Sequence, residues 1–172
     1  MLRLPPNVDR FDFMTPRTDR SLRSDYLHLH LITTRWHDND VYGHINNVQY
    51  YAFFDTTVNQ FLLNRGVLDI ERGEVIGLVV ETACRYFAPI AFPEKVVAGL
   101  RVARIGNSSV RYEIGLFRGE ASDGLDHFAS GEEAAIAEGH FVHVYVDRIH
   151  RRPCSLPSEL RSTLESIQIG SS

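Results

Sequence analysis

The chain has 172 residues, of which 44% are apolar and 23% are charged, and its formal net charge is −4. These values are typical of one globular domain with a hydrophobic core of its own. They argue against general nucleic-acid binding, which requires a positive field, and no run of about eighteen apolar residues is present that could cross a membrane.

The first part of the chain changes character near residue 25. Residues 1–24 contain three prolines and five arginines without hydrophobic periodicity, so we expect a loosely held N-terminal arm. From Tyr26 onward, leucines alternate with histidines, which predicts a half-buried strand that runs to about Trp36. Residues 37–47 are rich in Asp and Asn and are expected to form a loop.

A long helix is predicted from Val48 to Arg65. Asn46 can cap its N-terminus, and Gly66 stands where a helix commonly ends. The large apolar residues of this segment are Tyr50, Tyr51, Phe53, Phe54, Val58, Phe61 and Leu62. Because they cover well over half of the helix circumference, we expect a central helix that is buried all round.

The rest of the chain is predicted to be mostly strand. Apolar runs or alternations occupy residues 75–88, 94–105, 110–116 and 134–147. A hairpin turn is expected at Gly106-Asn107, a loop over residues 119–131, and a short helix from about Ser158 to Ser166. The chain therefore divides into an arm at 1–24, a main domain at 25–157, and a short C-terminal helix with a tail at 158–172.

This order of elements predicts an α+β fold. One strand, one long helix and four further strands with short links favour a curved antiparallel five-stranded sheet wrapped around one central helix. A single sheet covers only part of such a helix, so a second copy of the chain is expected to complete the cover.

The loop before the helix carries the residues with chemical potential. Asp38 and Asp40 precede a helix N-terminus, whose unpaired N–H groups and partial positive charge keep a carboxylate ionised and can receive an oxyanion. Gly43 would allow a substrate to approach the backbone closely. A base or nucleophile beside an oxyanion site is the arrangement that acyl transfer requires.

Two other interpretations of this loop stay open on the residues alone. Asp and Asn favour polar turns and helix caps without any further function. A cation loop that begins at Asp38 would place Gln49 where a bidentate Glu belongs, and the nearby histidines fit no standard zinc spacing. We therefore expect no metal here.

Residues 35–50 resemble the signature of the 4-hydroxybenzoyl-CoA thioesterase family of hotdog proteins. The family pattern Asp-x-Asp-x-x-Gly-His-x-Asn-Asn-x-x-Tyr runs here from Asp38 to Tyr50. The resemblance continues at residues 85–89 and 144–157, and it covers about residues 26–162. It implies a hotdog fold, hydrolysis of an acyl-CoA thioester to free acid and CoA, and no cofactor.

The resemblance also implies roles for single residues. Asp40 matches the catalytic carboxylate, either as a nucleophile or as a general base, whereas Asp38 supports the loop. A main-chain N–H near Asn47 matches the oxyanion donor. The expected substrate-binding and oxyanion residues are Gly43, His44, Asn46, Asn47 and Tyr50.

Several further expectations complete this interpretation. Cys84 is expected to be an inert buried thiol, and His28, His30, His140 and His143 to face solvent or an interface. The partners implied are an acyl-CoA substrate and one or three further copies in a homodimer or homotetramer, in the cytoplasm, without nucleic acid or membrane. The alternatives are a hotdog hydratase or dehydratase, and a protein that binds or senses acyl-CoA without cleaving it.

Overall fold

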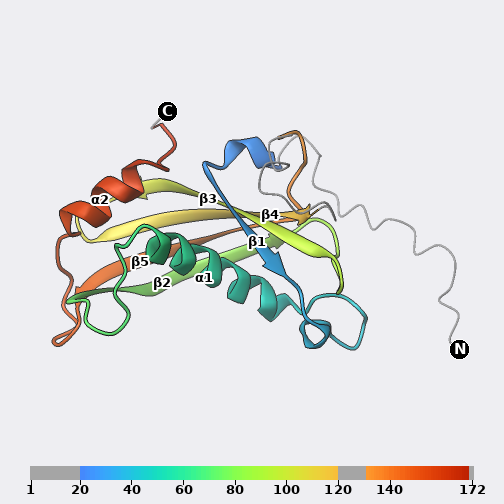
Figure 1. Cartoon of the computed structure of the whole chain (residues 1–172), viewed down its shortest axis with the longest axis horizontal. Helices are drawn as coiled ribbons and strands as arrows, with labels where there is room; N and C mark the ends of the chain where they lie inside the picture. Colours follow the sequence, from blue (N-terminus) through green and yellow to red (C-terminus); the bar gives the residue numbers. More distant parts are fainter. Residues whose placement is uncertain (1–19, 120–130, 171–172) are drawn as a thin grey trace, which may run out of the picture.

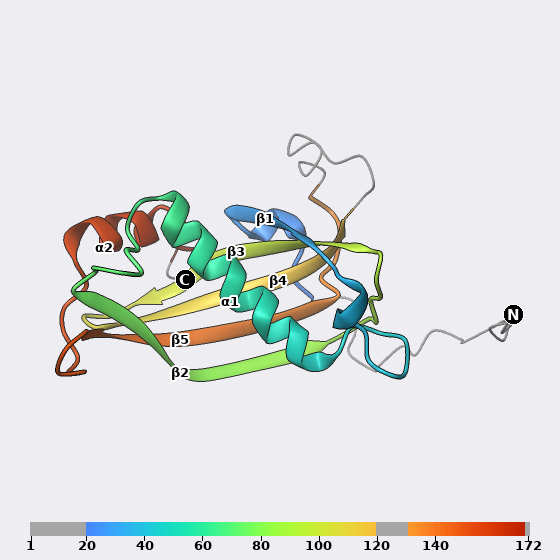
Figure 2. The ribbon, with the colours of Figure 1, turned by 60° about the horizontal axis from the view of Figure 1, so that its bottom comes forward.

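The computed structural model describes residues 20–119 and 131–170. One antiparallel five-stranded sheet has the strand order β1-β3-β4-β5-β2. Its strands are β1 (His28–Thr33), β2 (Val75–Tyr86), β3 (Lys95–Ile105), β4 (Ser109–Gly119) and β5 (Ala137–Asp147). Helix α1 (Asn47–Asn64) lies obliquely across one face of this sheet, as Figures 1 and 2 show. The predicted hotdog arrangement is therefore confirmed.

Two sequence predictions lie largely or wholly outside the described residues. The arm expected at residues 1–24 is described only from residue 20, where a short 3-10 turn at Arg23–Asp25 follows. The loop expected at residues 119–131 is described only at its two ends. The division of the chain into three parts stays a prediction.

The main core fills the space between α1 and the sheet. Phe54, Val58 and Phe61 of the helix are fully buried, as are Leu100 and Tyr112 of the facing strands. Burying a side chain of this size contributes about 2 kcal/mol. This layer fixes the position of α1 on the sheet and therefore the position of both ends of the helix.

Helix α1 begins and ends within one residue of its predicted bounds. The Asn46 side chain accepts a hydrogen bond of 3.1 Å from the Val48 amide, which makes Asn46 the N-cap. Gly66 has a φ of +70°, and its amide donates to the Leu63 carbonyl at 2.9 Å. Such a left-handed residue after the last turn is a common end of a helix.

The expectation that α1 is buried all round is wrong for a single chain. Asp55, Thr56 and Leu63 are exposed on the side that faces away from the sheet. The sheet forms one layer only, so it covers one side of the helix, and no second layer from the described residues covers the other.

Strand β1 is shorter than predicted and carries its histidines toward the helix. The His28 ring lies 4.9 Å from the ring of Phe61 in α1. Leu29 and Leu31 instead pack on the opposite face, in a small cluster around Tyr26. Both faces of β1 are therefore partly covered, which the leucine alternation alone does not reveal.

Strand β2 is an edge of the sheet and pairs only with β5. Three consecutive apolar residues near its middle, Leu78, Val79 and Val80, are 37%, 47% and 61% exposed. An edge strand with exposed apolar side chains is a template for pairing with another chain.

The C-terminal helix α2 (Ser158–Glu165) lies over the end of β3 and buries Leu160 and Leu164. Behind it, the Val102 amide donates to the Ile167 carbonyl at 2.9 Å, which ties the chain end to the sheet. No helix in the described part of the chain is long and apolar enough to span a membrane.

Candidate active site

The loop before α1 is closed by its own backbone. The Asp40 amide donates to the His44 carbonyl at 2.8 Å, and the Asn46 amide donates to the Asp38 carbonyl at 2.8 Å. The Gly43 amide completes the turn by donating to the Asp40 carbonyl at 3.1 Å. The chain thus doubles back and returns directly into the helix, so that residues 38–47 form one compact unit at its N-terminus.

Asp38 holds this unit together. Its carboxylate is fully buried and accepts hydrogen bonds from the Arg35 amide at 2.7 Å and from the Arg35 side chain at 2.9 and 3.1 Å. Burial alone would raise the pKa of Asp38, but the hydrogen bonds and charge of Arg35 hold that pKa below its usual value. A buried carboxylate that is already bonded in this way supports the loop rather than reacting.

Asp40 has a different environment. The residue is only half-buried, and its Oδ1 accepts hydrogen bonds from the Tyr42 amide at 2.8 Å and the His44 amide at 3.4 Å. Its Oδ2 has no hydrogen-bond partner among residues 20–119 and 131–170. One oxygen is therefore fixed by the loop, and the other is available to a substrate or a water molecule.

The tip of the loop is open to its surroundings. Gly43 has a φ of +83°, and apart from its chain neighbours no atom of the described residues lies within 4 Å of the place where its Cβ would be. Val41 and Tyr42 are 93% and 83% exposed, and His44 is exposed as well. Exposed apolar groups of this size next to a free carboxylate oxygen are typical of a surface that binds a ligand or a partner chain.

The start of α1 offers a donor beside the loop. The amides of Val48 and Gln49 are satisfied by the side chain and the carbonyl of Asn46. The Asn47 amide donates to no acceptor in the part of the chain that the structure describes. A free amide at a helix N-terminus, where the helix dipole is positive, suits an oxyanion.

Tyr50 lies one turn into the helix and is 4% exposed. Its ring meets the ring of Tyr86 from β2 edge to face at 4.9 Å, and the Tyr86 hydroxyl donates to the Asn47 carbonyl at 3.4 Å. Burial raises the pKa of Tyr50 to about 12, so its phenol stays protonated at neutral pH. The two tyrosines thus brace the helix start against the end of β2.

The loop is also fastened to the segment that follows β2. The Ile45 amide donates to the Ile90 carbonyl at 2.8 Å, and the Asn39 side chain accepts from the Phe92 amide at 3.0 Å. Trp36 packs on the ring of Phe92 at 6.0 Å. Through these contacts the sequence-predicted residues Asp40, Gly43, His44, Asn46, Asn47 and Tyr50 come together at one end of α1.

Cys84 lies close to this end of α1, where its side chain interacts with that of Tyr86. Burial raises the pKa of the Cys84 thiol to about 11, which leaves it protonated and a poor nucleophile at neutral pH. Arg85 forms an ion pair with Glu138 at 2.8 Å. No group of three His, Cys, Asp or Glu side chains within residues 20–119 and 131–170 could hold a metal ion.

One expectation about the histidines is wrong. His143 does not face solvent, because it is 5% exposed and packs against Phe141 and Tyr112 in the interior. A signal for this was present in the sequence, since His143 alternates with Phe141 and Tyr145 and so shares their face of the strand. Burial lowers the pKa of His143 to about 4, so its ring is neutral near pH 7.

Residues 34–164 match the model of a family described as the thioesterase-like superfamily. The crystal structure of the PA5185 protein from Pseudomonas aeruginosa is 54% identical, with a TM-score of 0.79, and the match covers 89% of this chain and 99% of that one. The PA2801 protein of Pseudomonas aeruginosa, a candidate thioesterase, is 28% identical with a TM-score of 0.68, and the match covers 81% of this chain and 98% of that one.

A more distant structure shares the fold. The 1,4-dihydroxy-2-naphthoyl-CoA thioesterase from Synechocystis is 14% identical with a TM-score of 0.66, over 79% of this chain and 93% of that one. At this identity the likeness concerns the fold alone. No curated protein sequence matches the chain significantly.

Proposed function

The chain belongs to the thioesterase-like superfamily, and on that premise we propose that it hydrolyses an acyl-CoA thioester to the free acid and CoA. The thioesterase from Synechocystis, which shares the fold, acts on a CoA ester of an aromatic acid. Thioester hydrolysis uses both the free carboxylate oxygen of Asp40 and the free Asn47 amide at the start of α1. For this reason we prefer it to the hydratase and sensor alternatives.

The hydrogen bonding of the Asp40 carboxylate is the observation that carries the proposal. A carboxylate with one oxygen held by loop amides and the other without a partner is fixed in direction and yet free to react. Asp38, two residues earlier, has both oxygens bonded by Arg35 and is fully buried. Asp40 is therefore the carboxylate of this pair that can reach a substrate.

Two reaction paths are open to Asp40. As a nucleophile, its oxygen would attack the thioester carbonyl, expel the CoA thiolate and form a mixed anhydride that water then hydrolyses. As a general base, Asp40 would take a proton from water while that water attacks the same carbonyl carbon. In both paths the thiolate leaves, takes up a proton, and the acid is released.

The helix start would stabilise the oxyanion that either path creates. The free Asn47 amide at the positive end of α1 supplies the donor, and Asn46 holds the first turn in place through its cap. Gly43 and His44 form the open rim over which the substrate enters. Tyr50, protonated and buried beneath the first turn, keeps the donor in position.

We propose further that the protein works as a homodimer or homotetramer. The exposed apolar residues in the middle of β2 and the uncovered side of α1 are surfaces that a second copy would bury. Analytical ultracentrifugation of the full chain and of Val80→Lys tests this. The variant is expected to shift toward the monomer, and a wild-type monomer at micromolar concentration would contradict the proposal.

The decisive experiment is thiol release from a panel of acyl-CoA esters by the wild type and by Asp40→Asn. Asparagine keeps the Oδ1 acceptor and hence the turn, but it removes the charge and the basicity. We expect kcat to fall by about a thousandfold or more, which corresponds to roughly 4 kcal/mol. Turnover that survives the substitution would remove Asp40 from the mechanism.

Asp69→Asn is the matched control. Asp69 follows α1 instead of preceding it, and its Oδ1 also accepts from amides two and three residues later, at 3.0 and 2.8 Å. The same chemical change in the same kind of turn is expected to leave kcat within about twofold of the wild type. Tight acyl-CoA binding without turnover of any ester would favour the sensor alternative.

A further inference from the structure

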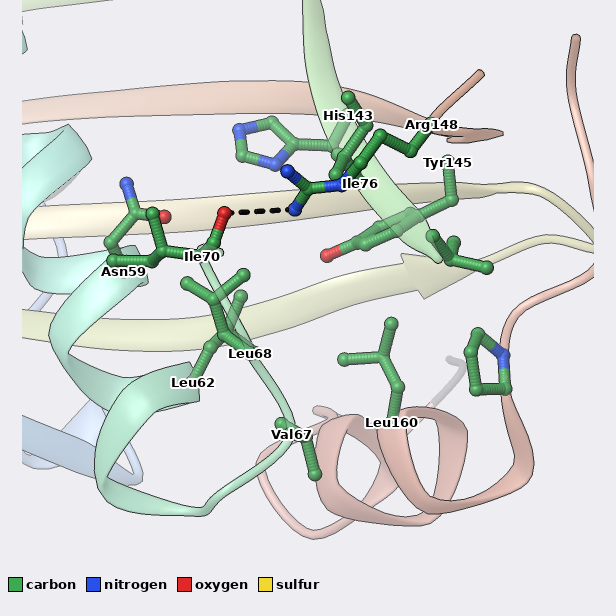
Figure 3. Close-up of a pocket in the computed structure, with 13 residues that line it drawn as sticks. Asn59, Leu62, Val67, Leu68, Ile70, Ile76, His143, Tyr145, Arg148 and Leu160 are labelled. Atoms are coloured by element: carbon green, nitrogen blue, oxygen red, sulfur yellow. Dashed lines mark hydrogen bonds between the residues drawn. The ribbon is translucent and has the colours of Figure 1, made fainter. Parts of the chain in front are cut away.

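A cavity of about 460 Å³ lies at the opposite end of α1 from Asp40 (Figure 3). It is lined by the last turns of α1, the loop at residues 66–74, the start of β2, the end of β5 and the start of α2. Its walls are mostly apolar and include Leu62, Val67, Leu68, Ile76 and Leu160. A volume of this size is in the range of small-molecule sites.

The distance along α1 separates this cavity from the reactive loop of the same chain. Asn59, which lines the cavity, lies twelve residues beyond Asn47. At 1.5 Å per residue this is about 18 Å. The cavity is therefore a second feature of the molecule and not an extension of the Asp40 loop within one chain.

One wall of the cavity carries a buried polar side chain without a partner. His143 is 95% buried, being 5% exposed, and its Nε2 is buried without a hydrogen-bond partner among the described residues. Its Nδ1 would lie only 3.0 Å from a Cβ at Gly77, another lining residue. Because Gly77 has no side chain, the wall is open at the edge of the imidazole.

Asn59 supplies a second polar group in the same space (Figure 3). Its Nδ2 donates to the carbonyl and the Oδ1 of Asp55 at 2.9 and 3.1 Å, which fixes the carboxamide. Its own Oδ1 accepts nothing from the described residues and remains available as an acceptor. The cavity thus combines apolar walls with a small group of unused hydrogen-bonding atoms.

An unpaired imidazole in the interior is unfavourable in the empty protein. A buried polar group without a partner costs about 1–3 kcal/mol, and a phenylalanine would fill the same place without that cost. A ligand that bonds to the ring would recover this energy. The ring is neutral near pH 7, so it offers one donor and one acceptor but no positive charge.

The cation that lines the cavity is engaged with the backbone of the adjacent loop. Arg148 is its only basic residue besides His143 among the described lining residues. The Arg148 guanidinium already donates to the carbonyl oxygens of Gly73, Asp69 and Ile70, and the last of these bonds is drawn in Figure 3. Arg148 therefore holds the loop after α1 through its Nε and Nη2. The unpartnered groups of His143 and Asn59 are neutral, and they suit an uncharged ligand.

We propose that this cavity binds an uncharged, mostly apolar molecule or acyl group that carries one hydroxyl or carbonyl oxygen, which bonds to His143 and Asn59. Two sources share this chemistry: the acyl part of a thioester substrate, and a free small molecule. Binding itself does not depend on the thioesterase activity proposed above, so it can be tested even in a protein without turnover.

The test is an NMR titration of the full chain with p-cresol and with toluene, which differ by one hydroxyl group. We expect both to bind to the wild type, with p-cresol binding about tenfold more tightly because of one added hydrogen bond. Absence of binding by either probe, or equal affinity for both, would overturn the proposal.

Substitutions distinguish the contribution of the hydrogen bond to binding from that of the cavity itself. His143→Phe keeps the ring and is expected to bring the affinity ratio of the two probes close to one. Asn59→Ala, on the half-buried side of α1, should reduce the same ratio by a smaller factor. Should both variants discriminate between the probes as the wild type does, the assigned partners are wrong.

Leu68→Trp is expected to fill the cavity and to lower the affinity for both probes by about tenfold or more. Leu27→Trp is its matched control, because Leu27 is 58% exposed and lies outside the cavity. The control should bind both probes like the wild type. Equal losses in the two tryptophan variants would show that binding takes place elsewhere and would refute the proposal.

The two sources are distinguished in the thiol-release assay with p-cresol added. If the cavity receives the acyl group, p-cresol raises KM without changing kcat in the wild type, and Leu68→Trp abolishes this competition. If the cavity takes a free small molecule, KM for the thioester stays constant at p-cresol concentrations that saturate the titration. The NMR titration decides whether the site exists. The assay decides only whether its ligand is the acyl group of the substrate or a free small molecule.

Discussion

The two ends of helix α1 present opposite chemical environments. At its N-terminus, Asp40 is half-buried, carries a free carboxylate oxygen and lies beside an unused amide. At its C-terminus, an apolar cavity surrounds His143, whose ring is buried and neutral. One end is therefore suited to charge and reaction, and the other to the recognition of apolar groups.

The two environments differ because Asp40 is only half-buried at one end, whereas His143 is buried at the other. The positive end of a helix dipole stabilises a carboxylate, and partial exposure to water keeps the desolvation free energy of the charge small. At the other end, several elements far apart in the sequence converge on His143 and leave it only 5% exposed. The burial of a titratable group in such surroundings favours its neutral form. One helix thus separates a half-buried carboxyl group from a buried, neutral imidazole.

The largest effect on stability should come from His143 and appear as a pH dependence. Its pKa is about 6.5 in the unfolded chain and about 4 in the folded one, so the unfolded chain binds more protons between these values. The free energy of unfolding should therefore fall as the pH is lowered from 6.5 to 4, by about 3 kcal/mol from this group. Urea titrations at several pH values measure it.

The comparison variant for this prediction is His143→Phe. Burial also lowers the pKa of His28 and of His30, so only the difference between wild type and variant isolates His143. We expect the variant to lose less stability than the wild type between pH 6.5 and 4. Parallel curves would mean that the ring is already accessible to protons in the folded state.

At the other end of α1, Asp38→Ala should lower the free energy of unfolding by about 2 kcal/mol. The substitution removes a buried acceptor of four hydrogen bonds from Arg35, although the exposed Arg35 side chain can turn to water. Because the pKa of Asp38 is lowered, its contribution is present above pH 3.8 and lost below it, as the pH falls through the folded value.

Asp69→Ala provides the reference for that measurement. Asp69 is exposed and accepts two hydrogen bonds within its own turn, so its loss should cost less than about 1 kcal/mol. Denaturant titration at pH 7 compares the two variants directly. Equal losses would contradict the supporting role that burial gives to Asp38.

The smallest predicted effect on stability concerns the two glycines that precede and follow α1. Gly43 and Gly66 have φ values of +83° and +70°, and a Cβ would meet nothing within 4 Å at either position. Alanine at either position should therefore cost only the backbone strain, about 1 kcal/mol. Thermal unfolding should show similar losses for the two variants, whereas only Gly43→Ala should lower the rate of thiol release. A matching loss of rate in Gly66→Ala would remove the functional difference between the ends.

Much of the fold follows from short-range patterns. The Asn46 cap and the Gly66 stop set the bounds of α1, because capping depends on residues within one turn. The hairpin at Gly106 was predictable for the same reason, and its amide donates to the Ser109 carbonyl at 2.7 Å. The position of Asp40 before a helix N-terminus is likewise a fact of chain order.

Other features could not be predicted because they depend on which elements meet. The direction of His28 toward Phe61, and of Leu29 away from it, depends on the layers that cover the two faces of β1. The exposed side of α1 could not be read from composition, since Leu63 is apolar and yet 39% exposed.

The sequence by itself determined the α+β order of elements, the bounds of the long helix and the loop that carries Asp40, because each rests on neighbouring residues. Only the tertiary structure decided that Asp38 is fully bonded while Asp40 keeps a free oxygen. It alone brought Asn59, Gly77 and His143 around one cavity. Those residues are far apart in the chain, and only packing of α1 on the sheet makes them neighbours.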